Sequence, residues 1–192
     1  MDCHEIIKGV YVFEPRVFSD SRGSFSETYH QEKYAELGLK ESFVQDNLVR
    51  SSARVLRGLH YQNPNAQGKL VSVFEGTIHD VAVDLRPDEP TFGCHIAIVL
   101  SSENRKQVYI PKGFAHGYYV LSDSALVHYK CTDSYSPAAE RGVCWNDPDL
   151  GIIWPDTEPI VNERDLMWEA LKTRLSAEEL SRWGGTLYAE LS

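Results

Sequence analysis

Short runs of β-branched and aromatic residues dominate residues 55–132. Each run is alternating or continuously apolar and ends at Gly, Pro, Asn, Asp or Ser, a pattern typical of strands separated by tight turns. The runs are VLRGLHYQ, KLVSVFEG, TIHDVAVDLR, CHIAIVLS, KQVYIP, GYYVLSD and ALVHYKCT. They leave little room for helices between them, so the pattern predicts an antiparallel sandwich or barrel. We expect hairpin tips at Glu75-Gly76, Ser101–Asn104 and Ser122-Asp123.

Helical periodicity flanks this β-rich block. The segment HQEKYAELGL (30–39) predicts a short helix before it. After it, NERDLMWEALKTRL (162–175) and SAEELSRW (176–183) also predict helices, and Ser176 with Glu179 forms a capping box at the start of the second. The sequence therefore predicts a β core with helical segments at its C-terminal end.

Length and charge narrow the class of protein. The chain has 192 residues, of which 42% are hydrophobic and 24% charged, which suits one globular domain. We predict a single domain over 1–192, with its core at about 10–155 and a helical tail at about 163–192. The net charge of −9 would repel polyanions, so we expect no nucleic-acid partner and no anionic-membrane partner. A small anionic ligand would need a local cluster of Arg and Lys.

The cysteines and the first residues indicate a cytoplasmic protein. Cys3, Cys94, Cys131 and Cys144 form no Cys-x-x-Cys pair, so we expect free thiols rather than a zinc ribbon or a dithiol redox motif. The start MDCHEIIKGVYVF does not have the pattern of a signal peptide, and no apolar run reaches the length of a membrane span.

Three segments combine a strand-like pattern with chemically active side chains. LRGLHYQ followed by QGKLV places Arg57, His60 and Lys69 on two successive strands. The other two segments are IPKGFAHGYY, with Pro111, Gly113 and His116, and VHYKCTDSYSP, with Tyr129, Lys130 and Tyr135.

The first hypothesis for these segments is a metal site. Pro-x-Gly-x-x-His resembles the second motif of the cupin superfamily of small β-barrels, whose metal-binding members also carry His-x-His and a glutamate in a first motif. Here the first motif is His60-Tyr61-Gln62, and the next glutamate is Glu75. A catalytic metal usually holds three protein ligands, and His60, Gln62 and His116 would be a poor set, so we predict no metal.

The second hypothesis is acid–base chemistry on an anionic, carbonyl-bearing substrate. An imidazole can take a proton at neutral pH, and a lysine beside the carbonyl oxygen would stabilise an enolate. Tyr129 could return a proton from the opposite side, and inversion at a carbon requires two faces. The alternative is that His60 and Tyr129 are ordinary strand residues.

Long motifs in one order identify a family that the chain resembles. They are DSRGSFSETY (20–29), FVQDNLVRSSARVLRGLHYQ (43–62), QGKLV (67–71), DVAVDLR (80–86), PTFG (90–93), IPKGFAHG (110–117), YKCTDSYSP (129–137) and WNDPDLGIIWP (145–155). From about residue 11 to 155, and weakly on to Asp165, the sequence resembles the dTDP-4-dehydrorhamnose 3,5-epimerase family. The resemblance implies a mainly β, cupin-type jelly roll. It also implies a homodimer whose N-terminal strands help complete the partner's site.

The resemblance assigns a role to each matching residue. His60 matches the general base, Asp165 the carboxylate that orients it, Tyr129 the general acid, and Lys69 the residue that stabilises the enolate oxygen. The substrate would be a nucleotide-diphosphate-linked 4-keto-6-deoxy sugar, foremost dTDP-4-dehydro-6-deoxyglucose, with no cofactor. The residues that match substrate contacts or supports are Arg57, Gln45, Asn47, Arg22, Phe25, Glu27, His116, Tyr135 and Asp80.

Two departures leave the substrate open. Leu48-Val49 follows QDN where the family commonly has a more polar pair, and His79 precedes Asp80 where an apolar residue is usual. Some relatives invert only carbon 3 or only carbon 5, so a single-position epimerase for another sugar stays an alternative. A non-catalytic sugar-nucleotide binding barrel is a further one, although a binder has no need of an acid and a base on opposite faces.

Overall fold

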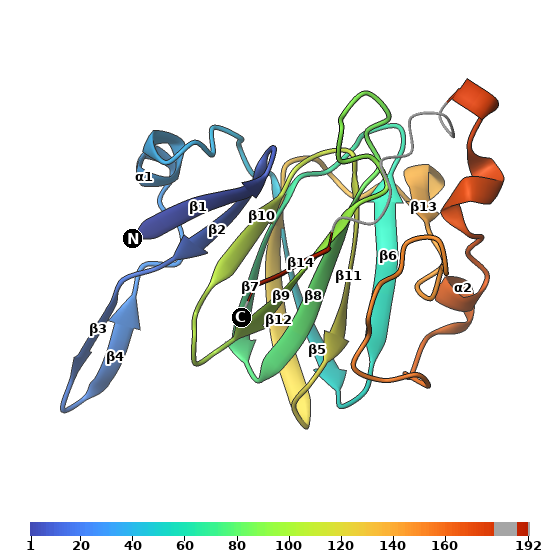
Figure 1. Ribbon diagram of the computed structural model, residues 1–192. Helices are drawn as coiled ribbons and strands as arrows, with labels where there is room; N and C mark the ends of the chain where they lie inside the picture. The colour runs from blue at the N-terminus through green and yellow to red at the C-terminus, as the bar shows by residue number, and fades with distance from the viewer. Residues whose placement is uncertain (179–187, 192) are drawn as a thin grey trace.

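The computed structural model describes residues 1–178 and 188–191, and Figure 1 shows two sheets packed face to face. Each sheet has six strands, in the orders β1-β2-β10-β7-β12-β5 and β13-β6-β11-β8-β9-β14. The first sheet contains β1 (Asp2–Ile7), β2 (Val10–Glu14), β10 (Gln107–Ile110), β7 (Lys69–Glu75), β12 (Ser124–Cys131) and β5 (Gln45–Ser52). The second contains β13 (Glu140–Gly142), β6 (Leu56–Gln62), β11 (Phe114–Val120), β8 (Thr77–Asp84), β9 (His95–Ser101) and β14 (Tyr188–Leu191). This sandwich confirms the predicted mainly β fold.

Successive strands mostly cross from one sheet to the other, as in a jelly roll. The turn at Gly76 joins β7 of the first sheet to β8 of the second, and the turns after Ser101 and at Ser122-Asp123 also change sheets. The prediction of hairpin tips at these positions is therefore wrong, although the turns themselves are present. Turn residues in a sequence indicate where a strand ends, but they do not specify which sheet receives the next strand.

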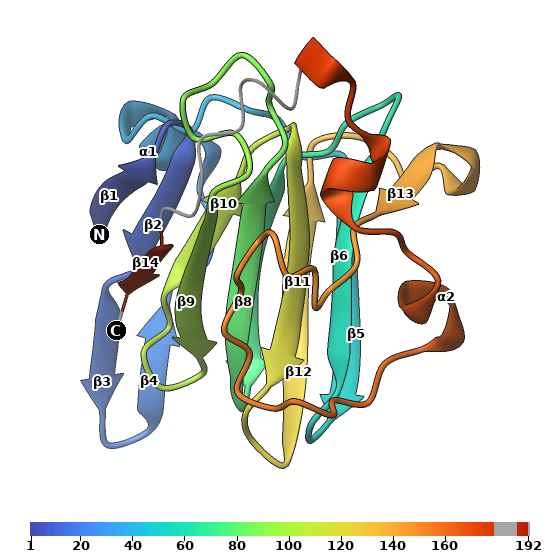
Figure 2. The ribbon, with the colours of Figure 1, turned by 45° about the vertical axis from the view of Figure 1, so that its right-hand side comes forward.

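Apolar side chains fill three layers. The largest cluster lies between the sheets and includes Val71, Ile96 and Val127. A second cluster covers the outer face of the second sheet, where residues 143–175 run across β8 and β11 (Figure 2). Because β8 is covered on both faces, its sequence is an almost continuous buried run. A third cluster, around Tyr34, packs α1 and the segment after it on the outer face of the first sheet.

The helices are shorter than predicted. Helix α1 (Gln31–Glu36) lies within the predicted range, and Gly38 ends it at φ +109°. The predicted helix at 162–175 is instead α2 (Glu163–Leu166) and the 3₁₀ turn η2 (Leu171–Arg174), while η1 (Pro137–Ala139) is a further turn. Residues 188–191 form strand β14, parallel to β9, where the helical tail was expected. The predicted capping box reaches Glu179, which lies outside the described residues.

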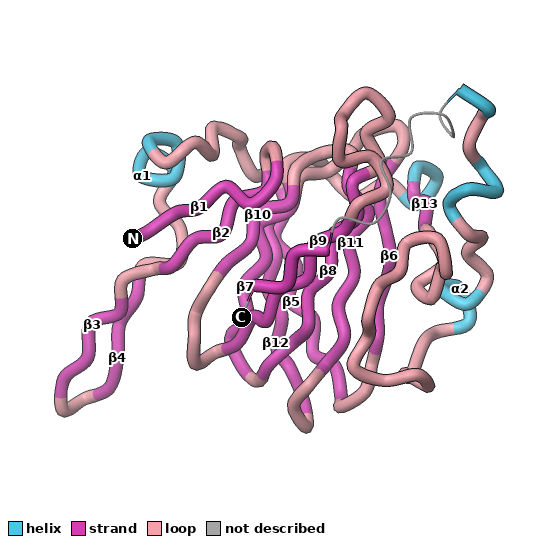
Figure 3. Tube along the Cα trace, in the orientation of Figure 1, coloured by secondary structure: helices cyan, strands magenta, loops and turns pink. Residues whose placement is uncertain are grey.

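A two-stranded hairpin projects from the body of the molecule. It consists of β3 (Val17–Asp20) and β4 (Gly23–Ser26), and Figures 1 and 3 show it extending away from both sheets. Arg105 tethers its base through hydrogen bonds to Ser24 and Ser26. None of the helices in the described part of the chain is long and apolar enough to cross a membrane.

Candidate active site

A cavity of about 340 Å³ opens between the two sheets where the apolar filling ends. Inward-facing positions of β5, β7 and β12 form one wall, and β6 and β11 form the other. Nine of the predicted site residues line it: Gln45, Asn47, Arg57, His60, Lys69, His116, Tyr129, Tyr135 and Asp165. The fold therefore brings together segments that are separated by as many as 120 residues in the sequence, from Gln45 to Asp165.

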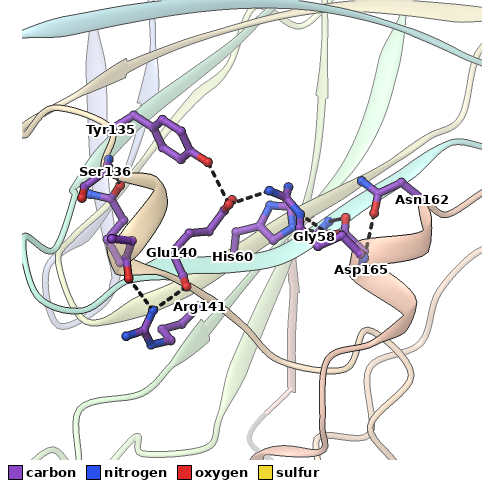
Figure 4. Close-up of polar contacts among 11 residues, drawn as sticks. Gly58, His60, Tyr135, Ser136, Glu140, Arg141, Asn162 and Asp165 are labelled. Carbon is purple, nitrogen blue, oxygen red and sulfur yellow. Dashed lines mark hydrogen bonds and ion pairs between the residues drawn. The ribbon is translucent and has the colours of Figure 1, made fainter.

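His60 and Asp165 form a hydrogen-bonded pair on the wall of the second sheet. His60 Nε2 lies 2.7 Å from Asp165 Oδ1, and the Gly58 amide donates to Asp165 Oδ2 at 3.2 Å (Figure 4). Burial alone raises the pKa of Asp165, but the hydrogen bond and the charge of His60 outweigh it and lower that pKa. Because an ionised carboxylate can only accept, Nε2 carries a ring proton, and in the neutral form of the imidazole the lone pair is then on Nδ1.

The local sequence explains why Asp165 reaches His60. Asn162 is the N-cap of α2, and its side-chain oxygen accepts from the Asp165 amide at 2.7 Å. Gly58 has φ +130°, and a Cβ placed there would lie 2.5 Å from the Gly117 Cα of β11. Only glycine permits this close approach of β6 to β11, so the strand that carries His60 depends on it.

Tyr129 and Lys69 lie on the wall of the first sheet, opposite His60. Tyr129 is on β12 and Lys69 on β7, and both are half-buried. Burial, with lesser contributions from Cys131 and Tyr118, raises the pKa of Tyr129 to about 12, so its hydroxyl keeps its proton at neutral pH. Burial lowers the pKa of Lys69, while the nearby Cys131, Asp80 and Glu140 oppose that shift. A proton donor and a cation therefore face the histidine across the cavity.

His116 and Asp80 form a second histidine–carboxylate pair, deeper in the second sheet. His116 Nε2 lies 2.8 Å from Asp80 Oδ2, and both side chains are buried. Asp80 itself does not line the cavity, but it holds His116, which does. This position fits the supporting role that the family resemblance implied.

Two charged residues that sequence reasoning missed complete the cavity. Arg164 donates to Glu140 at 2.5 Å and lies 3.7 Å from Asp165, and the Tyr135 hydroxyl donates to Glu140 at 2.8 Å (Figure 4). Tyr135 in turn donates its amide to Gln45. Arg164 could have been found from its position next to Asp165 in the segment NERD (162–165). Glu140 had no signal, because its ion-pair partner Arg164 is 24 residues away.

Three predicted contact residues lie outside this cavity. Arg22 and Phe25 are on the projecting hairpin, where Arg22 pairs with Asp20 and Phe25 is 67% exposed. Glu27 follows the hairpin and pairs with Lys33. Within one chain the structure does not bring these residues to the other site residues.

Possible metal ligands in the cavity have other partners. His60 and His116 each hydrogen-bond a carboxylate, and the amide of Gln62 bonds Asn65, Ser134 and Ser136. In the described residues no group of three His, Cys, Asp or Glu side chains is arranged to hold a metal ion. The donor set is therefore suited to hydrogen bonding and proton transfer.

The fold and the site together define a cupin-type barrel for acid–base chemistry on a small anionic substrate. The sequence model of the dTDP-4-dehydrorhamnose 3,5-epimerase family matches residues 4–173, and the chain belongs to this family of isomerases. This confirms the resemblance recognised in the sequence motifs.

Individual relatives cover almost the whole chain. A dTDP-4-dehydrorhamnose 3,5-epimerase from Pseudomonas aeruginosa is 52% identical over 166 residues, or 85% of this chain and 92% of that protein. The crystal structure of dTDP-6-deoxy-D-glucose-3,5-epimerase from Legionella pneumophila, in complex with dTDP-4-keto-L-rhamnose, is 45% identical with a TM-score of 0.87, covering 93% of this chain and 96% of that one. A 3′-monoepimerase from Streptomyces bikiniensis, in complex with dTDP-quinovose, is 34% identical with a TM-score of 0.81, covering 93% and 89%.

Proposed function

We propose that the protein catalyses epimerisation at carbons 3 and 5 of dTDP-4-dehydro-6-deoxyglucose, a nucleotide-diphosphate-linked 4-keto sugar. The observation that carries the proposal is the placement of His60, which is paired with Asp165, and of the protonated Tyr129 hydroxyl on opposite walls of one cavity. Family membership supports the substrate class, since the relatives are named for this reaction.

In the proposed reaction, the 4-keto group acidifies the C–H bonds on both of its sides. His60 Nδ1 takes the proton, and the bonding electrons move onto the keto oxygen to form an enolate. Lys69 stabilises that oxygen by charge and hydrogen bonding. Tyr129 then delivers its proton to the opposite face of the same carbon, which inverts it. Proton transfer from the imidazolium to the tyrosinate, directly or through solvent, restores both groups. No step requires a cofactor.

Of the cations in the cavity, Arg57 suits the diphosphate best, because Lys69 is assigned to the enolate oxygen. Arg57 and Lys69 form no ion pair within residues 1–178 and 188–191, whereas Arg164 is paired with Glu140 and Asp165. The planar fork of an arginine can bond two phosphate oxygens at once, so we assign the diphosphate to Arg57. Gln45, Asn47 and Tyr135 would contact the nucleotide side.

A single-position epimerase remains the second candidate. Leu48-Val49 stands where the family commonly has a more polar pair. Val49 lines the cavity, whereas Leu48 is 60% exposed on the outer face of β5, so only Val49 of these two can touch a substrate. An apolar side chain beside Asn47 and Tyr129 could change which sugar is accepted or which carbon is presented. The similarity to a 3′-monoepimerase keeps this candidate relevant.

We further propose that the protein acts as a homodimer in the cytoplasm. The projecting hairpin carries exposed Phe18 and Phe25 beside Arg22, and in a dimer these residues could reach the partner's cavity. Sedimentation velocity would test the dimer, and Phe25→Ala should raise KM more than it lowers kcat. The free state of all four cysteines supports a reducing compartment.

The experiment that tests the proposed function is proton NMR in deuterated water. The wild-type protein is incubated with dTDP-4-dehydro-6-deoxyglucose, and the loss of the proton signals at carbons 3 and 5 is followed separately. Exchange at both carbons supports the 3,5-epimerase, and exchange at one supports the single-position enzyme. His60→Ala should abolish both exchanges while leaving the melting temperature nearly unchanged. No exchange with the wild type would refute both candidates for this substrate.

A further inference from the structure

Ser51 connects the two walls of the cavity, although neither the sequence motifs nor the family resemblance gives it a role. It lies on β5 and is buried, with 4% of its surface exposed. Arg57 Nε of β6 donates to Ser51 Oγ at 2.9 Å, and the Tyr118 hydroxyl of β11 lies 3.3 Å from the same oxygen. A side chain of the first sheet therefore contacts two cavity-lining residues of the second.

The direction of these hydrogen bonds follows from their chemistry. A guanidinium can only donate, so Ser51 Oγ accepts from Arg57. The Ser51 hydroxyl then needs an acceptor for its own proton, because buried polar groups are nearly always hydrogen-bonded. In the part of the chain that the structure describes, Tyr118 Oη is the acceptor within reach. The Tyr118 proton is left to point into the cavity, which its side chain lines.

The same contact determines how Arg57 is held. Its guanidinium is anchored through Nε to Ser51, and a side-chain hydrogen bond between the same guanidinium and the Tyr118 hydroxyl joins the three residues in one group. An arginine fixed in this way already lies on the cavity wall before an anion binds, so it loses less side-chain freedom on binding. Arg164 differs, because Glu140 already occupies one of its terminal nitrogens.

We propose that Ser51 is a positioning residue: it holds the Arg57 guanidinium in place for the substrate diphosphate, and it orients the Tyr118 hydroxyl to donate into the same cavity. The identity of the anion rests on the proposed function. Ser51 is not expected to touch the reacting carbons, so its loss should weaken binding and leave the chemical step nearly unchanged.

The first test measures dTDP binding by isothermal titration calorimetry, together with KM and kcat. For Ser51→Ala we expect Kd and KM to rise about tenfold and kcat to stay within about twofold. Ser51→Thr keeps the hydroxyl and should retain most of the affinity. Ser51→Cys keeps the size but is a weak acceptor, so it should lose affinity like the alanine variant. The matched control is Ser52→Ala, which removes the same hydroxyl from the exposed face of the same strand.

A double-mutant cycle tests whether Ser51 acts through Arg57. Ser51→Ala should add no further loss of dTDP affinity in an Arg57→Ala background. Tyr118→Phe should raise KM by about threefold, again with no further loss in the Ser51→Ala background. Independent, additive losses would overturn the inference, as would an unchanged Kd for Ser51→Ala. If the wild type turns over the keto sugar but the variants give either of these contradicting results, only the positioning role of Ser51 is refuted and the proposed function stands. A wild type that neither binds dTDP nor exchanges protons would overturn the proposed function as well.

Discussion

The Asp165→Asn substitution would test the proposed base directly, because it removes one charge and almost no volume. In the wild type the carboxylate accepts from His60 Nε2, so the neutral imidazole has its lone pair on Nδ1. In Asp165→Asn the side-chain oxygen must still accept from the Gly58 N–H, so the NH₂ group of the new amide faces His60 Nε2. Nε2 would then have to accept, and the ring proton would move to Nδ1, the nitrogen that we assign to proton removal.

The expected loss of activity is large, because the base would carry its proton on the wrong nitrogen. General-base catalysis contributes roughly 10²–10⁴-fold, and enforcing the wrong histidine tautomer in a Ser-His-Asp triad lowers kcat about 10⁴-fold. Asp165 is fully buried, so water cannot easily replace its contact with His60. We expect kcat to fall about 10³-fold, which corresponds to about 4 kcal/mol. The free energy of unfolding should fall by only about 1–2 kcal/mol, since the shape is kept.

The assay is deuterium incorporation at carbons 3 and 5 under single-turnover conditions, with thermal melting to confirm folding. Asp149→Asn is the matched control, because Asp149 is exposed and pairs with Lys172 far from the cavity. The control should behave as wild type. If Asp165→Asn exchanged protons within about tenfold of wild type while remaining folded, the assignment of the tautomer and of the base would both be wrong.

Four further outcomes are expected. Tyr129→Phe should slow inversion more than deuterium wash-in, measured by comparing the rates of epimer formation and exchange. Activity should fall as the pH rises, with a midpoint below the usual lysine pKa of about 10.4, because burial lowers the pKa of Lys69. The same alkaline loss should be seen for the residual exchange of Tyr129→Phe. Gly58→Ala should destabilise the protein by about 3 kcal/mol or more in urea unfolding, because its Cβ would meet Gly117. The lowered pKa of Asp165 stabilises the folded state at pH values above the unfolded pKa of about 4. The difference in unfolding free energy between wild type and Asp165→Asn should therefore vanish as the pH falls through the lowered pKa of Asp165 in the folded protein.

The strands and the main residues of the cavity could be predicted from the sequence because both depend on local signals. Apolar runs such as that of β8 reveal strands, and the spacing of Arg57, His60 and Lys69 marked the site. The sheet to which each strand belongs could not be predicted, because it depends on packing between distant segments. His60 and Lys69 lie on strands that are successive in sequence, but those strands belong to opposite sheets.

Contacts that involve residues far apart in sequence were also out of reach. Ser51 and Tyr118 are 67 residues apart, and Arg164 and Glu140 are 24 apart. Ser51, Tyr118 and Glu140 are unremarkable within their own strands, and only its position next to Asp165 marks Arg164. Their importance arises only when the two sheets close over the cavity, so the structure was needed to find them.

The charge of the whole chain and the charge of the cavity lead to different conclusions about partners. A net charge of −9 argues against long polyanions, which would experience the field of the entire surface. A short diphosphate in the cavity interacts mainly with charges inside a Debye length of about 8–10 Å. There Arg57 and Lys69 have no carboxylate partner within residues 1–178 and 188–191, while Glu140 and Asp165 are engaged by Arg164 and His60. The acidic surface and the two cations of the cavity that form no ion pair in the described residues thus select together for a small anion, and raising the salt concentration should weaken binding only modestly, because the cavity is partly shielded from solvent.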